Sequence, residues 1–112
     1  MDQVERYRQI VRETLLPYTE YPYTDDKVVY EAVFDERADR YIVTAAGWLD
    51  EDHRIYFNLV HVDIIDGKIW IQYDGTEDGV GYDFERAGVP KEDIVPAFHP
   101  VSVRPHTGYG VG

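Results

Sequence analysis

His61 and Asp63 form the residue pair with the clearest chemical potential, because one residue separates them in an apolar, strand-like run. Side chains two residues apart in a strand point to the same face, so we expect the imidazole beside the carboxylate. Such a pair could bind a metal ion or begin an acid–base site, although a catalytic metal usually has three protein ligands. A histidine hydrogen-bonded within a sheet face is the simpler interpretation. An uncharacterised enzyme that uses both residues is an alternative.

The other candidates for chemistry are weaker. The acidic run from Asp74 to Gly79 lacks the ligand spacing of an EF-hand loop and follows a predicted strand, so it indicates helix capping instead. Gly79 and Gly81 could cradle a phosphate only with positive charge nearby, and acids surround them. Ser102, the only serine, lies outside any glycine elbow. The sequence therefore predicts no catalytic residue, no cofactor and no metal site.

The remaining histidines and the cysteine count support that prediction. His53, His99 and His106 lie near turns or prolines, and their spacing does not group them. The chain has no cysteine, which excludes disulfides and thiolate zinc sites. Its length of 112 residues and apolar fraction of 44% are typical of one globular domain, which we expect to span residues 1–112. The charged N-terminus and the lack of a membrane-length apolar run predict a cytoplasmic protein without membrane contact.

The charge of the chain indicates what it binds. The sequence has 22 acidic and 11 basic residues, for a net charge of −11. Affinity for nucleic acid comes largely from lysine and arginine at phosphates, so we expect no direct binding of nucleic acid and favour a basic protein partner. A direct DNA-binding accessory factor stays open as an alternative if the fold gathers the scattered bases on one face, in particular Arg6, Arg8, Arg12 and Arg104.

The spacing of apolar residues predicts two helices. The first carries an apolar stripe at intervals of three and four, begins at a cap formed by Asp2 with Glu5, and ends or kinks at Pro17. The second is expected from Thr76 to Ala87, with Thr76 as its cap and Gly88 as its stop. The turn-rich stretch 20–26 predicts a loop, and 90–93 predicts a short helical turn. The apolar stripe of the first helix consists of Val4, Tyr7, Val11, Leu15 and Tyr18.

Between these helices the sequence predicts four strands, at 28–34, 40–48, 54–65 and 68–73. Short polar turns join them, and Asp66-Gly67 is a strong signal for a two-residue hairpin because both positions tolerate positive φ. The prediction is an α+β fold: an antiparallel four-stranded meander with an N-terminal helix, a second helix after the sheet and an extended C-terminal segment packed on the body. The apolar residues of that segment favour packing and include Ile94, Val95, Phe98, Val101 and Val103.

The last strand of the meander predicts a partner surface. Trp70 is out of phase with Ile69 and Ile71, so it should point away from the face that the helices cover. A large exposed aromatic is a common interface anchor, and acids nearby would steer a basic partner. In the alternative interpretation, Trp70 packs under the C-terminal segment against Phe98 and Val101. The predicted contact residues are Trp70, Gln72, Asp74, Glu77 and Asp78.

The later half of the chain also resembles a known family. The runs HVDIIDGKIWIQYDGTEDG, AGVPKEDIV and FHPVSVRPHTGY closely resemble the XisI family of cyanobacterial proteins, and the earlier YRQIV, VFDERADRYIV and GWLD fit as well. XisI proteins are excision controlling factors of the fdxN element, which is linked to a programmed DNA rearrangement during heterocyst differentiation. The resemblance implies a non-catalytic accessory role with an XisH-type protein partner. It leaves a homo-oligomer open and supplies no catalytic residue.

Overall fold

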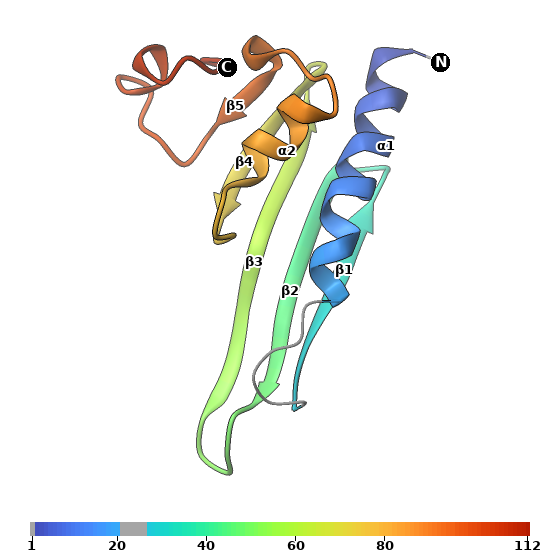
Figure 1. Ribbon diagram of the computed structural model, residues 1–112, viewed down its shortest axis with the longest axis vertical. Helices are drawn as coiled ribbons and strands as arrows, with labels where there is room; N and C mark the ends of the chain where they lie inside the picture. Colours follow the sequence, from blue (N-terminus) through green and yellow to red (C-terminus); the bar gives the residue numbers. More distant parts are fainter. Residues whose placement is uncertain (1, 21–26) are drawn as a thin grey trace.

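The computed structural model describes residues 2–20 and 27–112 (Figure 1). Two α-helices and five strands account for most of this part of the chain, and short 3₁₀ turns join or follow them. The stretch predicted as a loop at 20–26 lies almost wholly outside the described residues. In chain order the main elements are α1 (Gln3–Leu15), β1 (Val28–Asp35), β2 (Arg40–Trp48), β3 (Arg54–Ile65), β4 (Lys68–Asp74), α2 (Val80–Arg86) and β5 (Ile94–Pro96).

The strands of the described chain form one sheet in the order β1-β2-β3-β4-β5. The first four pair antiparallel with their chain neighbours, so the predicted meander is confirmed. At the β3–β4 hairpin, Asp66 has φ of 51° and Gly67 has φ of 76°, which are the positive values that a two-residue turn requires. The strand β5 was not predicted. It pairs parallel with β4 because the chain crosses back through α2 before it returns to the sheet edge.

Both α-helices lie on the same face of the sheet (Figure 1). Helix α1 begins where the carboxylate of Asp2 accepts a hydrogen bond from the Glu5 N–H at 2.8 Å, as predicted. It ends at Leu15, two residues before Pro17. The predicted stripe is buried at Tyr7, Val11 and Leu15, and Ile10 joins it. Beneath the helices, the core-facing residues of the strands are Tyr41, Val43, Val60, Val62, Ile64, Ile69 and Ile71.

Helix α2 begins at Val80 and not at Thr76, so the predicted start was wrong and the helix is shorter than expected. The chain from Gly75 to Gly79 is a loop, and the carboxylate of Asp74, the last residue of β4, organises it. One carboxylate oxygen accepts hydrogen bonds from the N–H and hydroxyl of Thr76, and the other accepts from the Val80 N–H at 2.9 Å. Thr76 therefore donates into the loop and does not cap the helix. The predicted stop at Gly88, with φ of 99°, is confirmed.

The C-terminal segment packs on the body, as predicted, but it is turn-rich and not extended, and it packs through fewer apolar side chains than expected. Ile94 and Val95 are buried, and the Gly110 N–H donates to the Ile94 carbonyl at 2.8 Å. Short 3₁₀ turns interrupt the segment at Lys91–Asp93, where a helical turn was predicted, and at Arg104–His106. The other apolar side chains of the segment stay exposed, by 48% at Phe98, 69% at Val101 and 40% at Val103.

Candidate functional site

His61 and Asp63 lie together on the open face, defined here as the face of the sheet opposite α1 and α2. His61 Nε2 is 2.9 Å from Asp63 Oδ1, so the predicted pair is formed. The same carboxylate accepts hydrogen bonds from Arg40 Nε at 3.4 Å and Gln72 Nε2 at 3.3 Å. Asp63 is 6% exposed, and a buried carboxylate is costly unless donors surround it. The three donors therefore explain how the sheet accommodates this acid.

The His61–Asp63 pair does not extend into a metal site. Within residues 2–20 and 27–112, no three histidine or acidic side chains gather closely enough to hold a metal ion. Two hollows in the described surface, one beside β5 and one between α1 and α2, are lined by other residues. This geometry favours the interpretation of His61 as a histidine hydrogen-bonded within the sheet face.

Trp70 points away from the helices, as its phase in β4 predicted. It stands between Asp63 on β3 and Val95 on β5. The Arg104 guanidinium lies 5.7 Å from the centre of its ring, and the Gly112 backbone approaches its outer edge. The C-terminal segment thus half-buries Trp70, through Arg104 and Gly112, whereas Phe98 and Val101 had been expected. The indole Nε1 is buried and has no hydrogen-bond partner among the described residues.

The other predicted contact residues divide into two groups. Gln72 and Asp74 are engaged within the fold, Gln72 with Asp63 and Asp74 with its own loop. Glu77 and Asp78 are exposed on the loop between β4 and α2, and neither has an ion-pair partner within the described parts of the chain. Among the predicted contact residues, the carboxylates free to meet another molecule are therefore those of Glu77 and Asp78.

Sequence reasoning missed a cavity of about 290 Å³ between β4, α2, β5 and the C-terminal segment. Its floor is apolar, and aromatic side chains from α2 and the C-terminal segment form its walls. These residues come from segments far apart in the chain, so no local spacing marks them as a group. Only the parallel pairing of β5 with β4 brings them together.

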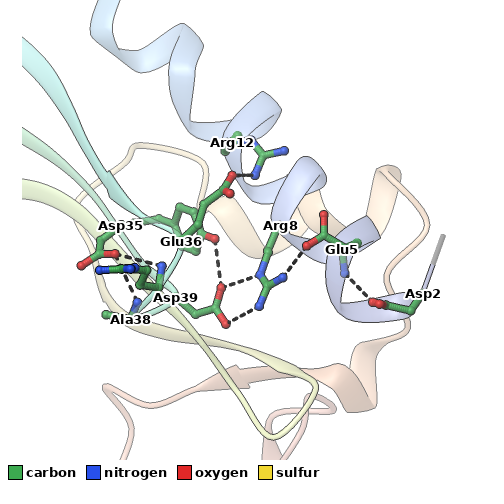
Figure 2. A network of polar contacts seen from close by, with 10 residues as sticks. Asp2, Glu5, Arg8, Arg12, Asp35, Glu36, Ala38 and Asp39 are labelled. Carbon is green, nitrogen blue, oxygen red and sulfur yellow. Dashed lines mark hydrogen bonds and ion pairs between the residues drawn. The ribbon is translucent and has the colours of Figure 1, made fainter.

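The arginines that an alternative hypothesis assigned to DNA are engaged within the fold. Arg8 hydrogen-bonds both carboxylate oxygens of Asp39, at 2.7 and 3.1 Å, and also pairs with Glu5. Figure 2 shows this network, in which Arg12 is likewise paired with Glu36. Arg104 donates to backbone carbonyls of the C-terminal segment, and Arg6 to the carbonyl of Gly88.

The network around Asp39 also shifts the pKa values of two of its members, Asp39 and Tyr41. Hydrogen bonding from Arg8 holds the pKa of the Asp39 carboxyl below its usual value, against the opposing effect of burial. The hydroxyl of Tyr41 donates to the same carboxylate at 3.1 Å. Burial, together with this hydrogen bond, raises the pKa of Tyr41 to about 12. These charges hold α1 against the β1–β2 turn and serve the fold.

The remaining histidines are dispersed, as predicted. His53 pairs with Asp50 in the β2–β3 turn, with 2.7 Å between Nδ1 and a carboxylate oxygen. His106 is exposed in a 3₁₀ turn, while His99 lines the cavity beside β5.

None of the helices in the described part of the chain is long and apolar enough to cross a membrane.

The geometry defines a small α+β domain in which two helices cover one face of a mostly antiparallel sheet and the most prominent His–Asp pair serves that sheet. The chain belongs to the XisI family, because the family model described as XisI protein matches residues 1–111. The resemblance noted in the sequence is therefore confirmed. No curated protein matches the chain.

Two solved structures share the fold. The chain is similar to the crystal structure of a XisI-like protein from Anabaena variabilis ATCC 29413, with 32% identity and a TM-score of 0.90, over 97% of this chain and 99% of the other. It is also similar to the fdxN element excision controlling factor XisI from the same organism, with 29% identity and a TM-score of 0.84, over 99% of this chain and 100% of the other.

Proposed function

We propose that this chain is a non-catalytic accessory factor in the excision of a DNA element and that it acts through a protein partner of the XisH type. Membership of the XisI family supports the link to excision, as does the similarity to a structure described as an excision controlling factor. The observation that carries the protein-partner part is the pair of exposed, unpartnered carboxylates of Glu77 and Asp78 on the described surface.

The proposed partner surface follows β4 into the loop before α2. Glu77 and Asp78 supply the charge that attracts a basic partner, and such charge mainly speeds encounter and sets specificity. Asp74 supports this role by fixing the loop through its bonds to Thr76 and Val80. Trp70 and Gln72 extend the surface onto the open face, where Trp70 is half-exposed.

A pull-down with an XisH-type protein tests this proposal. We expect the chain to capture that protein, and the charge reversals Glu77→Lys and Asp78→Lys together to weaken capture by about tenfold, or about 1.4 kcal/mol of binding free energy. The matched control carries the same charge change at Glu51 and Asp52, which are exposed in the β2–β3 turn far from β5 (Figure 1). Failure to capture the partner, or equal weakening by both variants, would count against the proposal.

Direct DNA binding is tested separately. A chain with a net charge of −11, whose Arg8 and Arg12 are paired with its own acids, should not bind duplex DNA tightly by itself. In a gel-shift assay at physiological salt we expect no binding at micromolar concentrations. Sub-micromolar binding would instead favour the DNA-binding alternative.

A further inference from the structure

The cavity beside β5 has a floor of buried apolar side chains. Ile71 of β4 is 4% exposed and Ile94 of β5 is 1% exposed, and Pro96 is buried beside them. The cavity volume is about 290 Å³. Ligand sites for small molecules range upward from about 300 Å³, so this cavity lies at the bottom of that range and has room for about one large side chain.

Aromatic side chains form the walls of this cavity, and two of them are unusually exposed. Tyr82 of α2 is 58% exposed and Phe98 is 48% exposed. The ring of Phe98 lies 4.6 Å from the imidazole of His99, which also lines the cavity. Aromatic surface exposed around an apolar hollow is typical of an interaction site, because burying it on binding is favourable.

The opposite wall is fixed in place before anything binds. The hydroxyl of Tyr109 donates to Glu85 Oε2 at 2.6 Å, and the Lys91 ammonium lies 5.8 Å from the centre of the Tyr109 ring. Burial and the bond to Glu85 raise the pKa of Tyr109 well above its usual value, so the phenol stays protonated and keeps donating. A preformed wall reduces the ordering that binding requires.

The charge around the cavity selects what enters it. Asp74 lines the cavity, and Glu77 and Asp78 are exposed on the same loop. The nearby bases do not cancel these acids, because Lys91 lies 3.6 Å from Glu85. The acids disfavour anionic ligands and favour a group with positive charge beside it.

We propose that this cavity receives one aromatic side chain from a lysine- or arginine-rich segment of a partner protein. The apolar floor and aromatic walls would bury the ring, while Glu77 and Asp78 would meet the flanking cations. The inference rests on the proposed function in one respect, since it assumes a protein partner. It adds the chemistry of the segment that the partner must present. It also places the anchor pocket on the helix-covered side of β4 and β5, opposite the open face on which Trp70 lies.

Short peptides test the chemistry without the partner. The probes are acetyl-Lys-Trp-Lys-amide, acetyl-Lys-Ala-Lys-amide, acetyl-Glu-Trp-Glu-amide and free indole, titrated into isotope-labelled protein while NMR signals of residues 79–82 and 98–99 are followed. We expect the Lys-Trp-Lys peptide to bind with a dissociation constant on the order of 1 mM and the other two peptides to bind about tenfold more weakly. Equal binding of the alanine peptide or the acidic peptide would overturn the inference. Indole binding as tightly as the Lys-Trp-Lys peptide would also overturn it and point to a small-molecule site.

Gly81 allows the cavity to be filled. A Cβ at this position would lie 3.7 Å from Tyr109 Oη and 3.8 Å from Ile71 Cδ1, which are ordinary contacts, and helix α2 tolerates a side chain better than glycine. Gly81→Leu should therefore fill the cavity and weaken binding of the Lys-Trp-Lys peptide by about tenfold. Gly81→Ala should leave most of the cavity open and should weaken that binding much less. A circular dichroism melt checks that both variants fold.

Phe98→Ala is a second test that does not depend on Gly81→Leu folding. It removes an exposed wall of the cavity and should weaken binding of the Lys-Trp-Lys peptide by a similar factor. Unchanged peptide binding in a folded Gly81→Leu protein, or in Phe98→Ala, would refute the assignment of the cavity. The XisH-type pull-down separates the two proposals. If that complex forms and survives Gly81→Leu, the cavity assignment fails and the proposed function stands. If the peptide binds at the cavity but no partner is captured, the proposed function fails and the cavity assignment stands.

Discussion

Two acidic turns of this protein use the same residue types in opposite ways. In the β1–β2 turn, Asp39 and Glu36 are paired with arginines of α1, as Figure 2 shows, and Asp35 accepts from two N–H groups of its own turn. At the other turn, Asp74 at the end of β4 accepts hydrogen bonds from Thr76 and Val80, while Glu77 and Asp78 on the loop face solvent unpartnered within the described chain.

The difference separates acids that hold the fold from acids that remain available. An ion pair between partly buried groups fixes two elements against each other, and Asp39 is 17% exposed where it meets Arg8. An exposed acid without a partner contributes little to stability but adds to the field that another molecule encounters. The contrast predicts that changes at the first turn lower stability and that changes at Glu77 and Asp78 affect binding alone.

The largest expected effect comes from Asp39→Ala. The change removes one of the two acids paired with Arg8, leaves the hydroxyl of buried Tyr41 unsatisfied, and places alanine at φ of 51°, where L side chains are strained. Together these losses should lower the free energy of unfolding by about 3 kcal/mol. Urea unfolding followed by circular dichroism measures it. A loss below about 1 kcal/mol, the range of exposed ion pairs, would mean that this turn is no better anchored than a surface contact.

Asp39→Asn isolates the charge, because asparagine tolerates positive φ nearly as well as aspartate. At pH 7 we expect it to cost about 2 kcal/mol, the range for hydrogen bonds to charged groups. The folded-state pKa of Asp39 is lowered, so its contribution is complete above the unfolded pKa near 3.8 and is lost as pH falls below that value towards the folded pKa. Urea titrations at pH 7, 5, 4 and 3 should therefore show the gap between wild type and Asp39→Asn narrowing only in the most acidic samples. A constant gap would exclude the carboxylate charge as its cause.

Much of the fold was predictable because its signals are local. The hairpin at Asp66-Gly67 and the alternation from Val60 to Ile71 depend only on neighbouring residues, and both were predicted correctly. The alternation fails beyond these residues, where bulges place Leu59 against the core and leave Tyr73 exposed. The strand β5 was missed because three residues ending in Pro96 have no recognisable period, and only pairing with β4 makes them a strand. The start of α2 was predicted wrongly because threonine favours helix caps and loop hydrogen bonds alike.

The candidate site was less predictable, because most of its contacts join residues that are far apart in the chain. The His61–Asp63 contact follows from strand geometry, so the sequence predicted it. The Arg8–Asp39 pair joins residues 31 positions apart, and the cavity beside β5 joins four segments. Net charge predicts a basic partner, but nothing local distinguished the paired acids of the first turn from Glu77 and Asp78.

Asp74→Ala should have an intermediate effect. The side chain holds the start of α2 by accepting from the Val80 N–H, and it closes the loop by accepting from Thr76. Losing a side chain in this capping role costs about 1–2 kcal/mol. A thermal melt measures the change, and Thr76→Val is the control that removes only the hydroxyl contact. If Asp74→Ala were as stable as the wild type, Asp74 would support the fold no more than Glu77 and Asp78 do, and the proposed difference between these acids would be wrong.

The smallest expected effect comes from Glu77→Gln combined with Asp78→Asn. Neither side chain has a hydrogen-bond or ion-pair partner in the described chain, so the double change should alter the free energy of unfolding by no more than about 0.5 kcal/mol. A small loss within that range is reasonable, because acids just before the start of α2 interact favourably with the helix end. The same variant should weaken capture of a basic partner, since it removes two charges without reversing them. A loss of stability above about 1 kcal/mol would show that these acids support the fold as Asp39 does. An unchanged melt together with weaker capture is the result that assigns the two acidic turns to different tasks.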